Sequence, residues 1–257
     1  MIRPLSDWPA AIEAVVSRTT AWNAVHVLRE TASTQDFART LPVGSVVIAG
    51  RQRAGRGRLG RGWADTGEDG LAMTVTVTAQ PPERSAVACA IAAAEAIEEL
   101  CQASSGGAPR IGFKWPNDLM VANKKLGGIL IERHDGVDSI GIGVNCSQRS
   151  FSNEIAMRAT SLALHGFLVD RLDLACAILT SLDRWLIAQS EQIETAFIAR
   201  DILCGTRAAF GTPTGVVEGL VVGIDPVRGL RVRTSRGDQV LAAATTRVLV
   251  PEDRLEL

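Results

Sequence analysis

A short stretch rich in arginine and glycine most constrains what this chain can fold into. It reads RQRAGRGRLGRGW and runs from Arg51 to Trp63. Glycine lets the backbone adopt positive φ and approach a ligand closely, and arginine carries a planar fork of donors that fits phosphate or carboxylate. Neither a helix nor a strand interior favours this mixture. We therefore predict a ligand-binding loop built from Arg51, Arg53, Arg56, Arg58 and Arg61 among Gly55, Gly57, Gly60 and Gly62.

The stretch also has features of other glycine- or arginine-rich motifs. Residues 55–60 match GxGxxG, and a strand-like run at 45–49 precedes them. A dinucleotide fingerprint must open a helix, whereas residues 64–70 are turn formers that lead into the strand-like LAMTVTV. The stretch lacks the Gly-Lys-Ser/Thr of a Walker A loop, and it is too short for a disordered RNA-binding tail. A solvated basic loop without a ligand stays open as the alternative.

Charge and cysteine content limit the partners and the compartment. With 27 Lys+Arg against 28 Asp+Glu, the net charge of −1 gives no general attraction for nucleic acid. Five widely spaced cysteines without a CxxC pair suit reduced thiols and not a disulfide framework or a zinc site. No signal peptide and no apolar run of membrane-spanning length is evident. We predict a cytoplasmic protein that does not contact a membrane.

Hydrophobic patterns predict a mixture of helices and strands. Asp7 is expected to cap a first helix with Pro9 in its first turn, which is too short to be a DNA-binding module. Ser33 is a candidate N-cap of a second helix; alternatively, Ser33, Thr34 and Gln35 contact a neutral polar ligand. Strands are predicted at 24–30, 45–49, 71–77 and 138–146, and amphipathic helices at 83–101, 172–186 and 191–200.

A second informative stretch, RIGFKWPNDLMVANKKLGGILIE, runs from residue 110 to residue 132. Ala122-Asn123 predicts the tip of a tight hairpin. Gly127-Gly128 would weaken a strand, so we expect either a bulge or a ligand lying against the backbone there. Lysines at a hairpin end are usually solvated, and chemistry alone does not separate Lys124 from Lys125.

The character of the chain changes near Cys204. The rest consists of short strands separated by glycine and proline, which is typical of a small antiparallel β-barrel. We predict two domains, 1–203 and 204–257, and find no catalytic group in the second.

The motifs in order resemble those of the biotin protein ligases that lack an N-terminal DNA-binding domain. They are Ser33-Thr34 with Gln35, Gln52 with AGRGRLGRGW, KWPNDL from Lys114 to Leu119, KLGGILIE from Lys125 to Glu132, and GVN from Gly143 to Asn145. The resemblance implies an α+β fold. Its catalytic domain would have a mixed central β-sheet packed with helices, like class II aminoacyl-tRNA synthetases, followed by a small Src-homology-3-like barrel.

The resemblance also implies a two-step reaction. Biotin would attack ATP, with Mg²⁺ present, to give biotinyl-5′-adenylate and pyrophosphate. A lysine of a biotin carboxyl carrier protein would then take the biotinyl group. Arg56 and Arg58 are candidates for a clamp on the reacting phosphates, with Arg61 as a third. Lys125 matches the active-site lysine of the family, which leaves Lys124 a surface role.

The remaining site residues are inferred from the same match. Ser33, Thr34, Gln35 and Gln52 would hydrogen-bond biotin, although the family more often has asparagine where this chain has Gln35. Trp63 would stack on adenine or else lie in the core, and Asp118 would help the metal, for which no protein cage is expected. Further contacts to biotin or ATP are predicted from Gly55, Gly57, Lys114, Asn117, Gly127, Gly128 and Asn145.

Several functional alternatives accompany this interpretation. Residues 51–65 and 147–159 are expected to be mobile in the empty enzyme and to close over the reactive adenylate. A lipoate–protein ligase or octanoyltransferase is the nearest enzymatic rival, and a non-catalytic RNA- or protein-binding module is the other. An exposed edge strand would serve a homodimer, the carrier protein or both.

Overall fold

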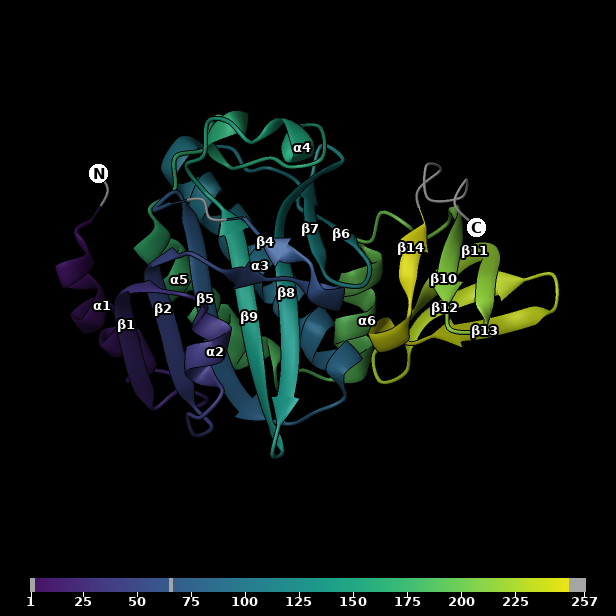
Figure 1. The fold of residues 1–257 in the computed structure, drawn as a ribbon, viewed down its shortest axis with the longest axis horizontal. Coiled ribbons are helices and arrows are strands. Elements are labelled where there is room, and N and C mark those ends of the chain that lie inside the picture. The colour runs from purple at the N-terminus through teal and green to yellow at the C-terminus, as the bar shows by residue number, and fades with distance from the viewer. Residues whose placement is uncertain (1–2, 65–66, 250–257) are drawn as a thin grey trace.

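A seven-stranded mixed sheet forms the centre of the protein. The structure is a computed structural model, which describes residues 3–64 and 67–249. The strand order is β1-β2-β5-β9-β8-β7-β6 (Figure 1). Only β1 and β2 pair in parallel, and every other neighbouring pair of this sheet is antiparallel. The strands are β1 Ala24–Thr31, β2 Ser45–Gln52, β5 Gly70–Thr78, β6 Gly112–Lys114, β7 Asp118–Val121, β8 Lys124–His134 and β9 Val137–Asn145.

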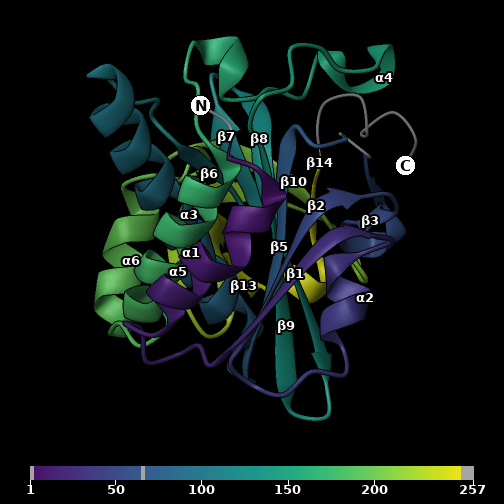
Figure 2. The same cartoon turned by 90° about the vertical axis from the view of Figure 1, so that its left-hand side faces the viewer.

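The long helices cover one face of this sheet and leave the other largely open. They are α1 Trp8–Val16, α3 Pro82–Ser105, α5 Arg171–Trp185 and α6 Ser190–Ile198. Figure 2 shows these four helices on one side of the sheet and the short α2, Thr34–Ala38, on the other. Six of the eight alanines of α3 are buried, so α5 can pack closely against it. The core therefore lies between the sheet and this helical layer.

The predicted helices are found with shifted ends. The helix expected at 83–101 continues to Ser105, and Gly106 ends it with φ +73°. Residues 186–189 separate α5 from α6, and the side chain of Asp170 caps α5 by accepting from Leu172 N at 2.8 Å.

Two predicted N-caps have different outcomes. Ser33 caps α2, since its Oγ accepts from Asp36 N at 3.5 Å. Asp7 lies at the predicted N-cap position of α1, with Pro9 in the first turn, but a 3₁₀ turn, η1 Leu5–Asp7, leads directly into the helix. Asp7 therefore has helical φ and ψ, and its side chain makes no capping bond.

A second, five-stranded antiparallel sheet follows α6. Its order is β13-β12-β11-β10-β14, with β10 Arg207–Thr212, β11 Gly215–Asp225, β12 Gly229–Thr234, β13 Gly237–Leu241 and β14 Arg247–Leu249. We call it the C-terminal sheet. It packs on the rest of the protein through α6 and through Phe210. The Phe210 and Trp115 rings meet edge-on, with their centroids 6.3 Å apart. The last residues of the predicted barrel, 250–257, lie outside the described residues.

Candidate functional site

A row of small residues crosses the open face of the seven-stranded sheet. Its members are successive cross-strand partners on β2, β5, β9 and β8, namely Ala49, Ala72, Gly143 and Gly128. They share the face that carries α2, because a Cβ at Gly141, two residues from Gly143, would lie 3.0 Å from the Gln35 side chain. A flat, largely apolar ligand can therefore lie against the backbone here.

Trp63 covers this row. It lies on β4, Gly62–Trp63, which pairs with β3, Gly55–Arg56, in a separate two-stranded hairpin. A Cβ on Gly143 would be 3.0 Å from the Trp63 ring, and one on Gly55 would be 2.9 Å from Trp63 Cβ. A side chain at either position would therefore displace Trp63. Trp63 is half-buried on the sheet face and is not part of the hydrophobic core, while its predicted contact with adenine stays a prediction.

A network of neutral polar groups lies beside the row. The backbone N–H and the hydroxyl of Thr34 both donate to Gln52 Oε1, at 2.8 and 3.0 Å. Thr74 Oγ1 in turn donates to Thr34 Oγ1 at 2.9 Å. Among the described residues Gln52 Nε2 has no hydrogen-bond acceptor, so this donor is available to a ligand carbonyl.

Gln35 belongs to the same network but has all its polar atoms bonded within the protein. Its Nε2 donates to Ser139 O at 2.9 Å and to Leu130 O at 3.3 Å. Its Oε1 shares the single Thr74 hydroxyl proton with Thr34 Oγ1; the two acceptors lie 3.1 and 2.9 Å from Thr74 Oγ1. The amide thus holds α2 against β5, β8 and β9, and a direct contact of Gln35 with a ligand stays a prediction.

Lys125 lies at the other end of the row. Its Nζ is 2.6 Å from Asp118 Oδ1 and 5.5 Å from the centroid of the Trp63 ring. Of the two alternatives predicted for Gly127-Gly128, a bulge or a ligand against the backbone, a bulge is present next to the glycines. Leu119 pairs with Gly127 and Met120 with Lys125, so Leu126 has no partner on β7.

The backbone of Lys125 is shared with a distant segment. Its N–H donates to Arg158 O at 2.7 Å, and its carbonyl accepts from Thr160 N at 2.8 Å. Lys124 Nζ instead donates to Ala156 O at 3.3 Å, which separates the two neighbouring lysines. Segment 147–159, which contains α4 Asn153–Ala156, is therefore tied to β8 at its far end.

The other predicted polar residues of this region have different surroundings. Asn117 donates to Ile129 O and accepts from Ile129 N, both at 2.9 Å, and so fixes β8 beside the KWPND turn. Lys114 is the cross-strand partner of Asp118 and, among the described residues, has no ion pair. Asn145 is buried and donates to Thr160 O at 2.9 Å, so it orders the segment that joins Lys125.

Arg58 reaches from the arginine–glycine loop to the C-terminal sheet. Its Nη2 donates to Ala243 O and, at 3.4 Å, to Thr246 O, at the 3₁₀ turn η4 Ala243–Thr245. Burial lowers the pKa of this guanidinium, the charge of Asp118 raises it and the charge of Arg61 lowers it. Arg58 is thus a partly desolvated cation, and no carboxylate of the described residues is hydrogen-bonded to it.

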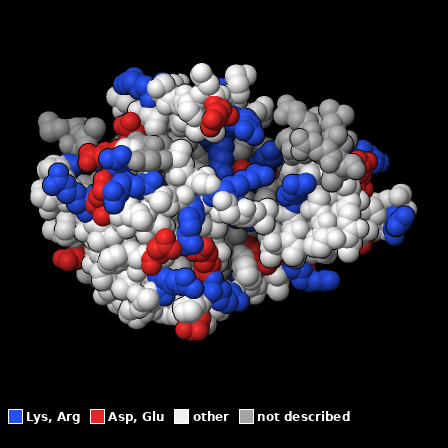
Figure 3. Space-filling model, viewed as in Figure 1, with Lys and Arg blue, Asp and Glu red and all other residues white. Residues whose placement is uncertain are grey.

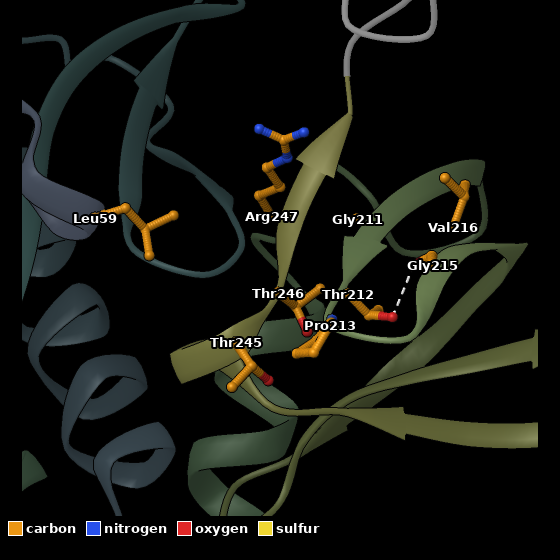
Figure 4. Close-up of a pocket in the computed structure, with 9 residues that line it drawn as sticks. All are labelled: Leu59, Gly211, Thr212, Pro213, Gly215, Val216, Thr245, Thr246 and Arg247. Atoms are coloured by element: carbon orange, nitrogen blue, oxygen red, sulfur yellow. Dashed lines mark hydrogen bonds between the residues drawn. The ribbon is translucent and has the colours of Figure 1, made fainter. Parts of the chain in front are cut away.

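A cleft of about 320 Å³ lies beside Arg58, between the loop and the C-terminal sheet. Figure 4 shows Leu59 facing the strand ends of that sheet across it. Leu59 has φ +58° and is 64% exposed, an arrangement that costs a leucine backbone strain without burying its side chain. Thr212, Pro213, Val216, Thr245 and Arg247 line the opposite wall.

The structure does not bring Arg56 to Lys125. Arg56 Nη2 lies 2.6 Å from Glu132 Oε2 and 2.9 Å from Asp36 Oδ1. The end of the Lys125 side chain lies beside Gly128, and Glu132 is four residues further along β8, roughly 13 Å at the usual strand rise. Arg61 is exposed and has no ion pair among the described residues, while its carbonyl accepts from Gly57 N at 2.7 Å.

Arg171 was not expected near the site, yet it holds both ends of the loop. Its Nη1 donates to Gly50 O at 2.7 Å and to Gly70 O at 3.2 Å, the residues that flank segment 51–69. The guanidinium is buried and lies over the Trp8 ring, with its central carbon Cζ 5.1 Å from the ring centroid. In the sequence it is only the first residue of an amphipathic helix, and no local signal marks it. Asp36 and Glu132 were missed for the same reason.

Comparisons with known proteins identify the family of this chain. Residues 23–148 match the model of the Biotin/lipoate A/B protein ligase family. The chain is 31% identical over 212 residues to the biotin–[acetyl-CoA-carboxylase] ligase of Paracoccus denitrificans, covering 77% of this chain and 88% of that protein. The chain belongs to the biotin protein ligase family.

Other relatives of this biotin protein ligase family member match over most of their length. The biotin–[acetyl-CoA-carboxylase] ligase of Mycobacterium tuberculosis is 29% identical over 262 residues, covering 93% of this chain and 97% of that protein. The biotin protein ligase of Aquifex aeolicus in complex with biotin and ATP has a TM-score of 0.78 at 25% identity, covering 89% and 99% of the two chains. The resemblance seen in the motifs is confirmed.

Three further findings concern metal-binding groups, apolar helices and cysteines. Among residues 3–64 and 67–249, no group of three or more histidines, cysteines, aspartates or glutamates is arranged to hold a metal. No helix in those ranges is long and apolar enough to cross a membrane. All five cysteines are free.

Proposed function

We propose that this protein activates biotin with ATP as biotinyl-5′-adenylate and transfers the biotinyl group to a lysine of a biotin carboxyl carrier protein. One observation carries the proposal: Lys125 lies at one end of a glycine- and alanine-lined row that Trp63 covers, and the Thr34–Gln52 network lies beside that row. An apolar bicyclic ring with one polar edge fits the row, and its carboxylate tail fits the lysine.

The first step joins two anions, so its transition state needs cations. Biotin carboxylate attacks the α-phosphorus of ATP, and pyrophosphate leaves. Lys125 is placed to contact the carboxylate and the bridging oxygen, while Arg58, Arg61 and Lys114 supply further positive charge. Figure 3 shows lysine and arginine side chains gathered over the middle of this face. Lys125 must exchange Asp118 for the substrate, because an ion pair at 2.6 Å neutralises it.

Biotin itself would be bound by neutral groups. Gln52 Nε2 is the donor left for the ureido carbonyl, while Ser33 and Thr34 position Gln52 and α2. The rings would lie on Gly128 beside Trp63, whose indole already fills the space over Gly143 and so forms one wall of the subsite.

Magnesium is part of this proposal as the partner of ATP. The residues near Lys125 offer one carboxylate, that of Asp118, which fits a metal that arrives bound to the triphosphate and keeps most of its own waters. When bound, the ion would neutralise the leaving pyrophosphate.

In the second step the ε-amine of the acceptor lysine attacks the biotinyl carbonyl carbon, AMP leaves, and an amide forms. The mixed anhydride must be kept from water in the meantime. We propose that the described part of loop 51–65, together with the first half of segment 147–159, closes over it; residue 65 lies outside the described residues. Hydrogen exchange with and without biotin plus ATP tests this, and unchanged protection in both segments contradicts it.

The finer architecture is proposed on the following grounds. We place the domain boundary at 203/204, just before β10, and suggest that the C-terminal sheet curls into a small Src-homology-3-like barrel. A register shift in β11 at Val221–Gly223 supports this curl. Five free cysteines favour a cytoplasmic protein. The edge strand β1 is the candidate surface for a homodimer or for the carrier, and sedimentation with and without the carrier separates the two.

Pyrophosphate exchange tests the proposed reaction directly. Labelled pyrophosphate should enter ATP when biotin is present and not when lipoate or octanoate replaces it. Exchange with lipoate alone would favour the rival ligase, and exchange with none of the acids would favour a binding module. Transfer of labelled biotin to an isolated carrier domain then tests the second step.

A further inference from the structure

We propose that Arg56 is a positioning residue and not a phosphate ligand. Its guanidinium, with Asp36 and Glu132, forms a clasp that holds the β3–β4 hairpin over the biotin subsite. We define the clasp as Arg56, Asp36 and Glu132. This inference rests on the proposed function, because it assigns these three residues to the binding of biotin.

The clasp joins three elements that are far apart in the sequence. Arg56 lies on β3, Asp36 on α2 and Glu132 on β8, and one nitrogen of Arg56 contacts both carboxylates. The hairpin has only two residue pairs, Gly55 with Trp63 and Arg56 with Gly62. A two-stranded hairpin of this length is not stable by itself, so its position depends on contacts with the rest of the protein.

What the clasp holds in place is Trp63. Gly55 is the cross-strand partner of Trp63 and immediately precedes Arg56, so fixing Arg56 fixes the strand that pairs with the tryptophan. Trp63 in turn covers Gly143 and contacts Lys125. Release of Arg56 would let Trp63 move away from the row of small residues, and biotin would lose one wall of its subsite.

The charges favour this role over a phosphate clamp. Two carboxylates already surround Arg56, which makes its surroundings unfavourable for a polyphosphate. The clasp also lies four residues along β8 from Gly128, where the Lys125 side chain ends. Arg58, by contrast, donates to carbonyl oxygens alone among the described residues. It lies at the interface between the arginine–glycine loop and the C-terminal sheet, which we call the seam.

The members of the clasp are about half exposed, which sets the size of the expected effect. Their side chains are 39%, 53% and 41% exposed for Arg56, Asp36 and Glu132. Ion pairs of this kind are screened by water and salt and typically change an equilibrium by about two- to fivefold. The effect should therefore be modest, should fall as salt is added, and should concern binding and not the chemical step.

The test compares Glu132→Gln, Arg56→Gln and the double variant, each measured for biotin binding without ATP and for adenylate formation. We expect each single variant to weaken biotin binding by about two- to fivefold at low salt, with kcat within twofold of wild type. The double variant should be no weaker than Arg56→Gln alone, since both changes remove one interaction. Glu30→Gln is the matched control, because Glu30 pairs with Arg53 at the base of the same loop.

A phosphate clamp predicts a different pattern. Arg56→Gln would then lower kcat and leave biotin binding without ATP unchanged, and Glu132→Gln would have no effect on binding. That result, or an equal loss of binding in Glu30→Gln, would overturn the clasp.

Hydrogen exchange separates the clasp from the proposed function. In the protein without substrates, Glu132→Gln should speed amide exchange at 55–63, and added salt should speed it in wild type but not in the variant. This readout requires no biotin chemistry. If wild type failed to bind biotin but the exchange result held, the proposed function would fail and the clasp would stand as a structural contact; unchanged exchange would overturn the clasp.

Discussion

The arginine–glycine loop has two sides that are built differently. On the side of the seven-stranded sheet, buried Thr34 and Gln35 have every side-chain polar atom bonded, with Gln52 and Thr74 among their partners. On the side of the C-terminal sheet, Arg58 donates to the backbone carbonyls of Ala243 and Thr246. Further along the same interface, where α6 meets the C-terminal sheet, Asp201 Oδ2 and Arg231 Nε are buried with no hydrogen-bond partner among the described residues.

This difference suggests a division of labour. A fully bonded network resists deformation, because every movement leaves a buried polar group unsatisfied. A group without a hydrogen-bond partner loses no bond when it moves, so a region that contains such groups can change its conformation more readily. We infer that the sheet side is a preformed subsite for the uncharged ring system of biotin. The seam, where Arg58 is held only by carbonyls, is where the protein changes between the steps of the reaction.

The largest expected effect is at Lys125, where the two sides meet. Lys125→Ala should slow adenylate formation by about 10²–10³-fold, the range for losing one preorganised charge-stabilising group. Biotin-dependent pyrophosphate exchange measures it. Lys124→Ala is the control and should stay near wild type, because Lys124 contacts Ala156 O instead. A rate for Lys125→Ala within threefold of wild type would refute the assigned role.

Neighbouring glycines distinguish binding from folding on the sheet side. A methyl at Gly128 would make ordinary contact, 3.4 Å from Lys125 Cε, so Gly128→Ala should fold normally but weaken biotin binding by about 10- to 100-fold. A methyl at Gly127 would lie 2.6 Å from Gly143 O, so Gly127→Ala should lower the free energy of unfolding by about 1–3 kcal/mol. Calorimetric titration and thermal unfolding measure the two, and tight biotin binding by Gly128→Ala would place the ligand elsewhere.

Arg58→Gly tests the seam. It removes the charged donor to Ala243 O and Thr246 O, so the loop should open and release adenylate about tenfold faster, the loss expected for one hydrogen bond from a charged group. Labelling of lysines on an unrelated protein should rise in proportion. Arg53→Gly, on the same loop but paired with Glu30, is the control. No increase in unspecific labelling would remove Arg58 from this role.

Asp201 makes the interface between α6 and the C-terminal sheet sensitive to pH. Burial raises the pKa of its carboxyl to about 6, although a hydrogen bond from Leu203 N at 3.1 Å lowers it. Because the folded protein favours the neutral acid, the stabilisation is complete below the unfolded pKa, near 4, and is lost as pH rises through about 6.

Asp201→Asn should stay neutral and keep that stabilisation. The effect of the pKa shift is reduced because Asp201 is partly exposed. We therefore expect the free energy of unfolding of Asp201→Asn relative to wild type to rise by about 1–2 kcal/mol between pH 4 and pH 7. Urea unfolding at several pH values measures this. If the free energies of unfolding of wild type and Asp201→Asn changed with pH in parallel, the Asp201 carboxyl would not be desolvated.

The smallest effect is expected within the bonded network. Thr34→Val keeps the shape of the side chain but removes one of the two bonds to Gln52 Oε1, so biotin binding should weaken by about fivefold, the value of one hydrogen bond. Thr78→Val is the control, since Thr78 is exposed at the end of β5. Unchanged affinity in Thr34→Val would mean that the network does not orient Gln52.

Much of the fold follows from local sequence, and the site follows only in part. Alternating apolar residues predicted the strands, and Ala122-Asn123 predicted a hairpin tip that the structure forms with φ of +47° and +62°. Paired glycines predicted a bulge or a ligand against the backbone, and a bulge is present beside Lys125. The interactions of Arg58 could not be predicted, because its acceptors lie 185 and 188 residues away and are backbone carbonyls, which carry no residue signature.

The same reason explains two other differences. Arg56 has an obvious charge in the sequence, but its carboxylate partners come from two other elements, so no spacing rule shows that the charge is already neutralised. Asp7 is a good capping residue by type. Its neighbours Leu5 and Ser6 form a 3₁₀ turn first, and that preference cannot be read from the residue itself.

Arg171 fixes the two ends of segment 51–69 without contacting the segment itself through these bonds. One buried guanidinium holds the carbonyls of Gly50 and Gly70, so the distance between the two attachment points does not depend on what connects them. The whole intervening segment can therefore be exchanged for one of another length, by recombination or by a protein engineer, while β2 and β5 keep their register. Chimaeras that join after Gly50 and before Gly70 are the natural way to transplant new acid selectivity into this scaffold.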